Sequence, residues 1–478
     1  MTYKAIVSCA FVAAAASLQA HVASVDFTRV KGDVRPELHS SGWTPRMTAM
    51  SQGVNPDVEI VKSMGFKSAR THDWALVNTG QRVVDTHFIF PLMHLDANDP
   101  KNYVFAPTDH LLGLTRETGL DIFYRLGTSI EHTGPKVHFN AAVPEDFNKV
   151  ADVFAGIVRH YNRGWGKDGK KWGIKYWEIW NEPDGWNNMW VMPGGDTEEN
   201  DKIRRAKFCE FYALCIKRLK GEFGDEIKVG GPALCSMNEP YFKELFAACK
   251  KLGVAPDFIS WHYYGDNPSE VVDAADKARK ICDDAGFPKC ELIINEWHYM
   301  GCRWQDLRSA NPAVSALCQE GPTGHNNIDS AAFTLATLSL FQTSKYDQAF
   351  YYGCSHVGHW GYMNSTRQFN KNYYACRLFG EIVNNYSKIC GSEVFKRNYY
   401  ALAVKAADES KALLLVDFRN TDQIVKIKVS GVKKGAKVRA VALDHTRDNF
   451  PCEATFEDGE LTLTKPDKYS AAFYVTFR

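Results

Sequence analysis

Two glutamates of this chain, Glu182 and Glu296, each follow a short run of β-branched and aromatic residues, and they lie far apart in the sequence. The runs 175–182 and 291–297 are typical of strands. If both are strands of a closed parallel barrel, their carboxyl ends meet at one mouth, and the two glutamates meet there too. Two carboxylates that face each other across a pocket are what glycoside hydrolysis requires.

The residues around Glu182 are rich in tryptophan, because WEIWNEPDGW occupies positions 177–186. A general acid that works near neutral pH needs a pKa raised by apolar surroundings or a neighbouring anion, and an indole ring also offers a sugar an apolar face. We expect Trp186, in a polar loop after Pro183, to contact the ligand and Trp177 to pack in the core. The tryptophans that could serve the pocket are Trp177, Trp180, Trp186, Trp297 and Trp360.

The partner carboxylate, Glu296, must stay ionised, so hydrogen-bond donors are expected around it. The strand-end sequences ARTHD and WHYYG supply donors, and the amide beside Glu182 can bind a sugar hydroxyl. Because strand residues alternate between faces, Glu178, Trp180 and Glu182 should share one face, which puts Glu178 deeper in the barrel. There an ion pair with Arg70 is favoured over direct catalysis. The predicted polar substrate-binding residues are Arg70, His72, Asn181, His262 and Tyr264.

A second Asn-Glu-Pro triplet at 238–240 shows that this motif alone does not identify an acid. It follows a loop and opens a predicted helix, where Glu239 complements the helix dipole. Glu239 is therefore rejected as a catalytic residue.

Three other functions stay open on the residues alone. An inverting glycosidase would hold the same carboxylates about 6.5–9.5 Å apart, against about 5–5.5 Å for a retaining one. A non-catalytic sugar-binding protein would keep the aromatics but would tolerate loss of a carboxylate. A metal-dependent hydrolase would place its ligands around the barrel mouth, although no paired ligand spacing supports a metal and no cofactor is expected. Its ligands would be His72, Asp73, His262 and His298.

The charge balance disfavours nucleic acid and anionic membranes as partners, because 57 Lys and Arg stand against 56 Asp and Glu. A neutral oligosaccharide or polysaccharide suits this balance better. Arg303 and Arg308 could meet a uronic acid carboxylate near the mouth, but solvated loop charge is the favoured interpretation.

The pattern from 25 to about 386 alternates β-rich runs with amphipathic helical stretches, which predicts a (β/α)8 barrel. Two segments are long enough to shape the mouth, 78–110 and 300–327. After about 389 the chain shows alternating β-rich runs without helical periodicity, which predicts an antiparallel β-sandwich. The eight barrel runs are 38–43, 66–72, 121–127, 175–182, 227–234, 258–264, 291–297 and 348–354.

We therefore expect three parts: a signal peptide at 1–23, a catalytic barrel at 24–388 and a sandwich domain at 389–478. The apolar stretch from Ala5 to Ala16 and the small residues Ala20 and Ala23 indicate a cleaved export signal, and hence a secreted or periplasmic protein. Twelve of the 13 cysteines follow this segment, and we expect most of them to be small buried hydrophobes, with one or two disulfides.

The three strand-end sequences YWEIWNEPDGW, DFISWHYYGDNP and LIINEWHY together resemble those of retaining glycoside hydrolases of the barrel clan, most closely glycoside hydrolase family 39. That family includes β-xylosidases and α-L-iduronidases. The resemblance extends to GFKSARTHD, KVGGPAL and the β-rich tail. It implies that Glu182 is the acid and base and Glu296 the nucleophile, with Asn181, His262 and Tyr264 in supporting positions. The segments 78–110 and 300–327 depart from the family pattern, and substrate choice could differ there. The resemblance therefore defines the type of bond that is cleaved better than the sugar that is recognised.

Overall fold

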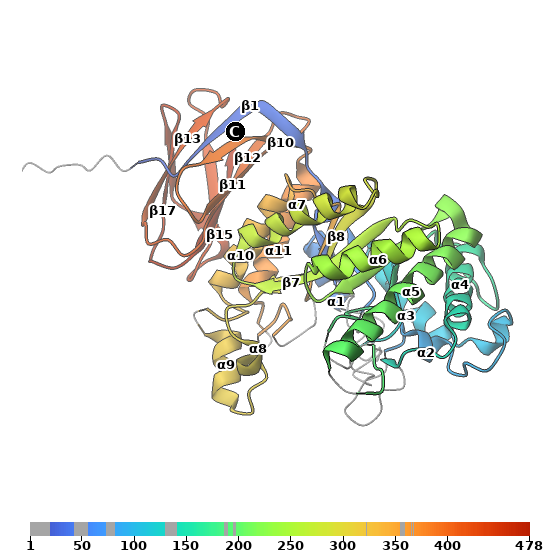
Figure 1. Cartoon of the computed structure of the whole chain (residues 1–478). Helices are drawn as coiled ribbons and strands as arrows, with labels where there is room; N and C mark the ends of the chain where they lie inside the picture. The colour runs from blue at the N-terminus through green and yellow to red at the C-terminus, as the bar shows by residue number, and fades with distance from the viewer. Residues whose placement is uncertain are drawn as a thin grey trace, which may run out of the picture.

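The chain forms two β structures, a closed barrel of eight parallel strands and a separate ten-stranded sheet (Figure 1). This is the predicted fold class, a TIM barrel with an additional, mostly antiparallel β domain. The computed structural model describes residues 20–42, 56–72, 82–129, 141–185, 190–194, 197–321, 323–353, 359–364, 366 and 368–478.

Each of the eight predicted runs contains one barrel strand, so the predicted order of the barrel is confirmed. The first strand is the shortest, and its two serines are poor strand formers. It still closes the barrel, because Ser41 pairs with Ala69 on one side and Ser40 with Phe350 on the other. The strands are β2 (Ser40–Ser41), β3 (Ser68–Arg70), β4 (Asp121–Leu126), β5 (Tyr176–Ile179), β6 (Lys228–Leu234), β7 (Phe258–Gly265), β8 (Glu291–Tyr299) and β9 (Gln348–Tyr351).

Helices cover the outside of the barrel, and α4 is one of several that begin at a side-chain cap. The Asp146 carboxylate accepts from the backbone of Asn148 and Lys149 at the start of α4, and Gly164 ends that helix with φ 71°. Glu239 lies in the first turn of α6, as predicted. The helices are α1 (Pro56–Ser63), α2 (Thr86–Ile89), α3 (Ala106–Glu117), α4 (Phe147–Arg163), α5 (Glu198–Phe223), α6 (Glu239–Lys251), α7 (Pro268–Asp284), α8 (Trp304–Leu307), α9 (Pro312–Glu320), α10 (Ile328–Phe341) and α11 (Lys371–Asn385), with short 3-10 turns η1 (Pro36–Leu38), η2 (Pro100–Asn102) and η5 (Gly224–Glu226).

The interior of the barrel is closed by an aromatic layer. Phe123 packs against Phe258 and Phe350 at ring-centroid distances of 5.4 and 4.8 Å, and Ile293 completes the cluster. Such a layer is a packed core and not a pore. Charged groups that enter the barrel must therefore lie toward the carboxyl ends of the strands, where the mouth is.

The second sheet begins with an N-terminal strand, which corrects the expectation that the barrel starts at residue 24. Strand β1 runs antiparallel to β10 and parallel to β13 and so belongs to the second sheet. The ends of the sheet fold toward each other, because Phe456 of β16 packs on Phe477 of β18 at 5.5 Å. In sheet order the strands are β15 (Asp448–Cys452), β14 (Val438–Leu443), β18 (Ala471–Phe477), β12 (Lys411–Asp417), β11 (Tyr399–Lys405), β10 (Lys388–Val394), β1 (Ala23–Asp33), β13 (Ile424–Ser430), β17 (Glu460–Thr464) and β16 (Ala454–Glu457).

One arginine of the second sheet ties the two domains together. Arg419, in the turn after β12, donates to Asp329 at the start of α10 (3.0 Å), to Asp266 after β7 (2.7 Å) and to the hydroxyl of Tyr299 on β8 (2.7 Å). Since β7 and β8 also carry predicted site residues, the second domain contacts the strands that build the mouth.

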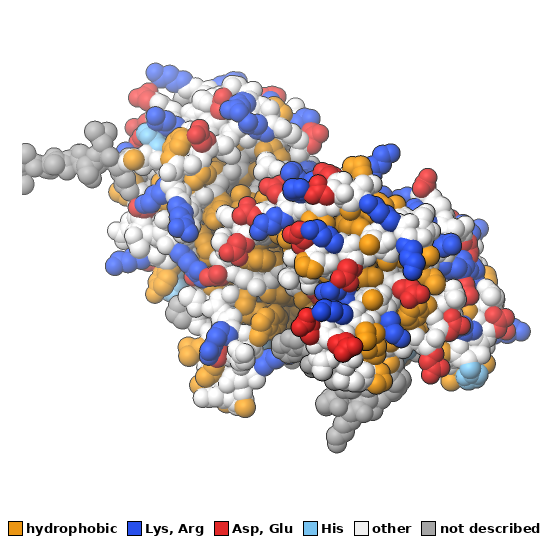
Figure 2. Space-filling model, viewed as in Figure 1, with side chains coloured by type: hydrophobic (Ala, Val, Ile, Leu, Met, Phe, Trp, Pro, Cys, Tyr) orange, Lys and Arg blue, Asp and Glu red, His pale blue; other side chains and the backbone are white. Residues whose placement is uncertain are grey.

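The surface carries interspersed charges of both signs on the face shown in Figure 2, which agrees with the formal net charge of +1. Of the described cysteines, all eleven have free thiols and most are buried, so the expected disulfides are not found among them. No helix in the described part of the chain has the length and apolar character that a membrane crossing needs.

Candidate active site

Glu182 is positioned by an abrupt turn at the end of β5. The backbone adopts positive φ at Trp180 (73°) and at Glu182 (47°), and the amide of Glu182 donates to the carbonyl of Ala233 in β6 at 2.9 Å. Positive φ at Trp180 breaks the two-residue alternation of the strand. Its ring packs on Gly127, where an added Cβ would lie 2.6 Å from the indole, so only glycine fits.

This turn corrects the expected role of Trp180. Trp180 is buried and packs against Trp190 and Phe211 on the outside of the barrel instead of sharing a face with Glu182. Trp177 stacks on Tyr124 in the core, as predicted. Neither the Trp177 ring nor the Trp180 ring therefore lines the space beside Glu182 and Glu296.

Glu296 is positioned by an irregularity in β8. The pairing register between β7 and β8 shifts after Ile294, so that His262 pairs with Glu296 and Asn295 is the additional residue. Asn295 and Glu296 both contact residues inside the barrel as a result. Trp297 then packs outward between β8 and α10, against Phe333 and Phe341, so the prediction that it contacts substrate is not supported by its position.

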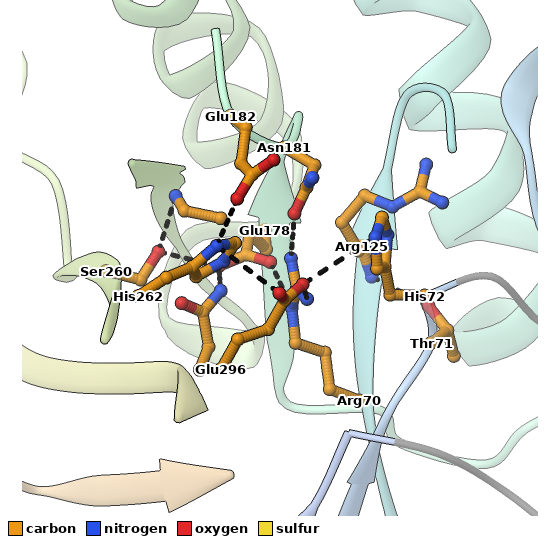
Figure 3. Close-up of polar contacts among 12 residues, drawn as sticks. Arg70, Thr71, His72, Arg125, Glu178, Asn181, Glu182, Ser260, His262 and Glu296 are labelled. Atoms are coloured by element: carbon orange, nitrogen blue, oxygen red, sulfur yellow. Dashed lines mark hydrogen bonds and ion pairs between the residues drawn. The ribbon is translucent and has the colours of Figure 1, made fainter. Parts of the chain in front are cut away.

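The two glutamates face each other at the mouth, with His262 between them (Figure 3). Nδ1 of His262 lies 2.7 Å from Oε1 of Glu182 and 3.4 Å from Oε2 of Glu296. One oxygen of each carboxylate and this nitrogen all lie within 4.8 Å of one another. Burial lowers the pKa of His262 to about 4, so the imidazole is neutral at neutral pH.

Arg70 joins three predicted residues into one buried network. Its guanidinium donates to Glu178 Oε2 (2.7 Å), Glu296 Oε1 (2.8 Å) and Asn181 Oδ1 (2.7 Å). Oε1 of Glu178 accepts from Ser260 at 2.6 Å. The predicted ion pair between Glu178 and Arg70 is therefore present, and Glu178 is occupied by protein donors below the mouth.

Glu296 has opposing influences on its ionisation. Burial raises the pKa of the Glu296 carboxyl above its ordinary value, and the nearby Glu182 acts in the same direction. The His262 and Arg70 groups and the Tyr264 hydroxyl, which donates to Oε2 at 2.7 Å, oppose this change. These donors favour the anion that a nucleophile needs.

His72 lies beside Glu296, and Trp360 packs against Tyr264, a donor to Glu296. Nε2 of His72 is 3.6 Å from Oε1 of Glu296, and burial followed by the Arg70 charge holds the pKa of His72 well below its ordinary range. The Trp360 ring packs against Tyr264 at a ring-centroid distance of 5.3 Å. Trp186 lies outside the described residues.

Two residues of this network were not predicted, Ser260 and Asn295. Ser260 is two positions before His262 on β7, so strand alternation would have found it. Asn295 donates to Glu178 at 2.5 Å only because of the irregularity in β8, which no local sequence signal marks.

The predicted metal alternative does not assemble as proposed. His298 is buried with Nδ1 2.8 Å from the carbonyl of Tyr299 and Nε2 2.7 Å from the Tyr351 hydroxyl, and Asp73 lies outside the described residues. Within the described ranges, the group whose spacing could hold a cation is Glu182, His262 and Glu296. A cation there would compete with the Arg70 guanidinium for Glu296. The loop arginines are solvated: Arg303 pairs with Asp306, and Arg308 is exposed.

Two facing glutamates at the mouth of a parallel barrel are the arrangement expected of a glycosidase-type barrel protein. Solved structures share this fold. A glucosidase from Croceicoccus marinus superimposes with a TM-score of 0.70 at 20% identity, covering 96% of this chain and 99% of that one. An alpha-L-arabinofuranosidase from Thermotoga maritima gives 0.60 at 16% identity, covering 96% and 99%. At these identities the likeness concerns the fold alone.

The chain belongs to glycosyl hydrolases family 39, which matches residues 24–278, just over half of its length. A beta-xylosidase from Geobacillus stearothermophilus is 24% identical over 179 residues, covering 33% of this chain and 32% of the relative. A beta-xylosidase from Caldicellulosiruptor saccharolyticus is 28% identical over 170 residues, covering 34% and 31%. The matched segment thus spans about a third of the length of each of these two relatives.

Proposed function

We propose that this protein is a retaining glycoside hydrolase that acts on β-xylosides. Glu296 attacks the anomeric carbon while Glu182 protonates the departing oxygen, so the C1–O bond breaks as the ester to Glu296 forms. Glu182 then takes a proton from water, the water oxygen bonds to C1, and the bond to Glu296 breaks. The sugar leaves with its original configuration.

The observation that carries this proposal is the approach of the two carboxylates. One oxygen of each carboxylate lies within 4.8 Å of the other, which supports the short separation of about 5–5.5 Å of a retaining pair over the about 6.5–9.5 Å of an inverting one. The donors on Glu296 come from two other strands of the barrel, Arg70 from β3 and Tyr264 from β7. Such pre-organised donors support a nucleophile held ready as an anion.

Asn181 and His72 complete the binding of the sugar in this proposal. Because Oδ1 of Asn181 accepts from Arg70, its Nδ2 group is the one that can donate to a sugar hydroxyl. His72 is a neutral imidazole and can exchange hydrogen bonds with a second hydroxyl. Trp360 and Tyr264 offer apolar surface on the same side.

The choice of a β-xyloside rests on the similarity of this chain to the two beta-xylosidases. A panel of aryl glycosides tests it, with proton NMR of the first product anomer. We expect the aryl β-xyloside to be the best substrate and the first product to be β-xylose. Preference for another sugar overturns the substrate, and first appearance of the α-anomer overturns retention.

Substitutions separate this enzyme from a sugar-binding protein on the same scaffold. We expect Glu296→Gln to keep less than about a thousandth of wild-type turnover. Glu182→Ala should regain activity with azide on substrates with good leaving groups and should yield a glycosyl azide. Unchanged turnover in both variants would leave only a binding role. Activity in a strong chelator would exclude a metal at the glutamate pair.

We also propose that the protein is exported by its N-terminal segment, which falls largely outside the described residues. Fractionation of the native host should then find the chain outside the cytoplasm with that segment removed. A full-length chain in the cytoplasm would contradict export.

A further inference from the structure

A second acidic residue, Asp184, lies in the same tight turn as Glu182. The amide of Gly185 donates to the carbonyl of Glu182 at 3.0 Å, which closes the turn around Pro183 and Asp184. Trp177 and Trp180 pack elsewhere, so these two rings do not form apolar surroundings for Glu182. A neighbouring anion is another physical means of keeping an acid protonated.

The carboxylate of Asp184 is anchored by the loop that follows β6. Oδ1 accepts from the backbone amide of Cys235 at 2.9 Å, and Nδ2 of Asn238 lies 3.4 Å from Oδ2. Both of these donors are neutral, so they fix the carboxylate without cancelling its charge. Burial raises the pKa of Asp184 to about 6, and the charge of Glu182 acts in the same direction.

The thiol of Cys235 is a neighbour of both carboxylates. The side chain of Cys235 is within hydrogen-bonding reach of both Glu182 and Asp184. It also packs against Gly185, where an added Cβ would be 3.0 Å from Sγ. Burial, reinforced by the two carboxylates, raises the pKa of this thiol far above its ordinary range, so it stays a neutral S–H donor.

We propose that Asp184 is a positioning residue for Glu182: the negative charge of Asp184, beside the Cys235 thiol, favours the protonated form of Glu182 in the first step and strengthens Glu182 as a base in the second. This inference rests on the proposed role of Glu182. The charge of Glu296 is lost when its ester to the sugar forms, whereas Asp184 takes no part in bond changes. The negative charge of Asp184 therefore acts on Glu182 in both steps of the reaction.

The other groups near this turn do not replace Asp184. His262 is neutral at neutral pH, and Arg70 binds Glu296 and Glu178 but makes no described ion pair with Glu182. Within the described part of the chain, the titratable groups that face Glu182 include Asp184, Cys235, His262, Tyr264 and Glu296. Those that face Asp184 are Glu182, Cys235 and Tyr241.

The test is Asp184→Asn, which removes the charge and keeps an oxygen for the Cys235 amide. Losing a nearby anion makes Glu182 ionise more readily, so the alkaline limb of kcat/KM against pH should move to lower pH by on the order of half to one unit. Asp184→Glu keeps the charge and should restore the wild-type limb. A limb that coincides with wild type in Asp184→Asn overturns the proposal.

Glu239→Gln is the matched control, because it makes the same charge change in the second Asn-Glu-Pro triplet. Glu239 pairs with Lys243 on the outer surface of α6, and its removal should leave the alkaline limb in place. An equal shift in this control would mean that the limb follows net charge and not Asp184.

Cys235→Ala gives a second test with the opposite sign, which also serves if Asp184→Asn does not fold. The thiol donates to the anionic form of Glu182, so its loss should move the alkaline limb to higher pH. Movement to lower pH, or none, contradicts the arrangement. Two substitutions that merely loosened the turn would not give shifts of opposite direction.

Carbon-13 NMR of glutamate carboxyl groups makes the result independent of turnover. The Glu182 signal, assigned by its absence in Glu182→Gln, should titrate at lower pH in Asp184→Asn than in wild type. If azide fails to rescue Glu182→Ala while this signal still moves, the proposed function fails and the coupling stands. If azide rescues and the signal does not move, only the coupling fails.

Discussion

Arg70 holds Glu296 and Glu178 with one guanidinium: Nη1 lies 2.8 Å from Oε1 of Glu296, and Nε lies 2.7 Å from Oε2 of Glu178. Arg70 thereby links the Glu296 carboxylate at the mouth to the Glu178 carboxylate, which lies deeper in the barrel. Arg70 and Glu178 are fully buried, so each depends on the other for its charge.

Arg70→Lys should therefore damage both stability and catalysis. A lysine ammonium cannot span the three oxygens that the planar guanidinium reaches. We expect the free energy of unfolding to fall by about 3–5 kcal/mol and kcat to fall by about 10²–10³-fold. Urea denaturation and steady-state kinetics measure these effects. Arg159 of α4 forms a partly exposed ion pair with Glu222 of α5. Arg159→Lys is therefore the control, and it should change neither the unfolding free energy nor kcat strongly.

The acid limb of the pH profile should report the ionisation of Glu296. Because burial raises the pKa of Glu296 and the anion is the reactive form, activity should be lost as pH falls through a value above the ordinary glutamic acid pKa. Tyr264→Phe removes a donor to the anion, so the acid limb should move to higher pH by about half to one unit.

Tyr263→Phe is the control for that substitution, because the Tyr263 hydroxyl donates to Glu270 and to the carbonyl of Asn267, away from the glutamate pair. Its acid limb should coincide with that of wild type. An unmoved limb in Tyr264→Phe would show that Tyr264 does not stabilise the Glu296 anion.

Arg419→Ala should weaken the attachment of the second domain. The substitution removes the donors to Asp329, Asp266 and Tyr299 and leaves Asp329, which is largely buried, with a weaker set of partners. We expect a loss of about 2–4 kcal/mol in unfolding free energy. Arg439→Ala, at an exposed position of β14, should stay within about 0.5 kcal/mol of wild type. Equal thermal stability of both variants would refute the attachment.

The mature chain should begin at His21 if the protein is exported. Val22 and Ala23 are buried in the core of the second sheet, and the amide of Val22 donates to Lys426 at 2.9 Å. Cleavage after Ala23, as the sequence suggested, would remove both side chains from that core. N-terminal sequencing of the secreted protein distinguishes His21 from Ser24, and Ser24 would contradict this prediction.

The sequence was sufficient for the barrel because its strands follow one another around a closed cylinder. Each β-rich run had only to pair with the next, and Glu182 and Glu296 then met at the mouth. Strand β1 was assigned to the wrong domain because its partners lie at the other end of the chain, in β10 and β13. No local pattern encodes such a pairing.

The tryptophans were harder to place, because their side-chain directions depend on backbone irregularities. Alternation along a strand put Trp180 with Glu182, but positive φ at Trp180 turns its ring outward. The register shift in β8 similarly turns Trp297 toward α10. Trp360 does lie beside Tyr264. Polar partners such as Arg70 and Glu178 were easier to predict, since opposite charges inside a barrel must find each other.

The most direct test of the central claim is to trap the sugar on the nucleophile. A 2-deoxy-2-fluoro xyloside with a good leaving group should inactivate the enzyme, and mass spectrometry of the digested protein should find the added sugar on Glu296. Attachment to any other residue, or turnover of a cleavable xyloside with inverted product and no covalent adduct, would contradict the account.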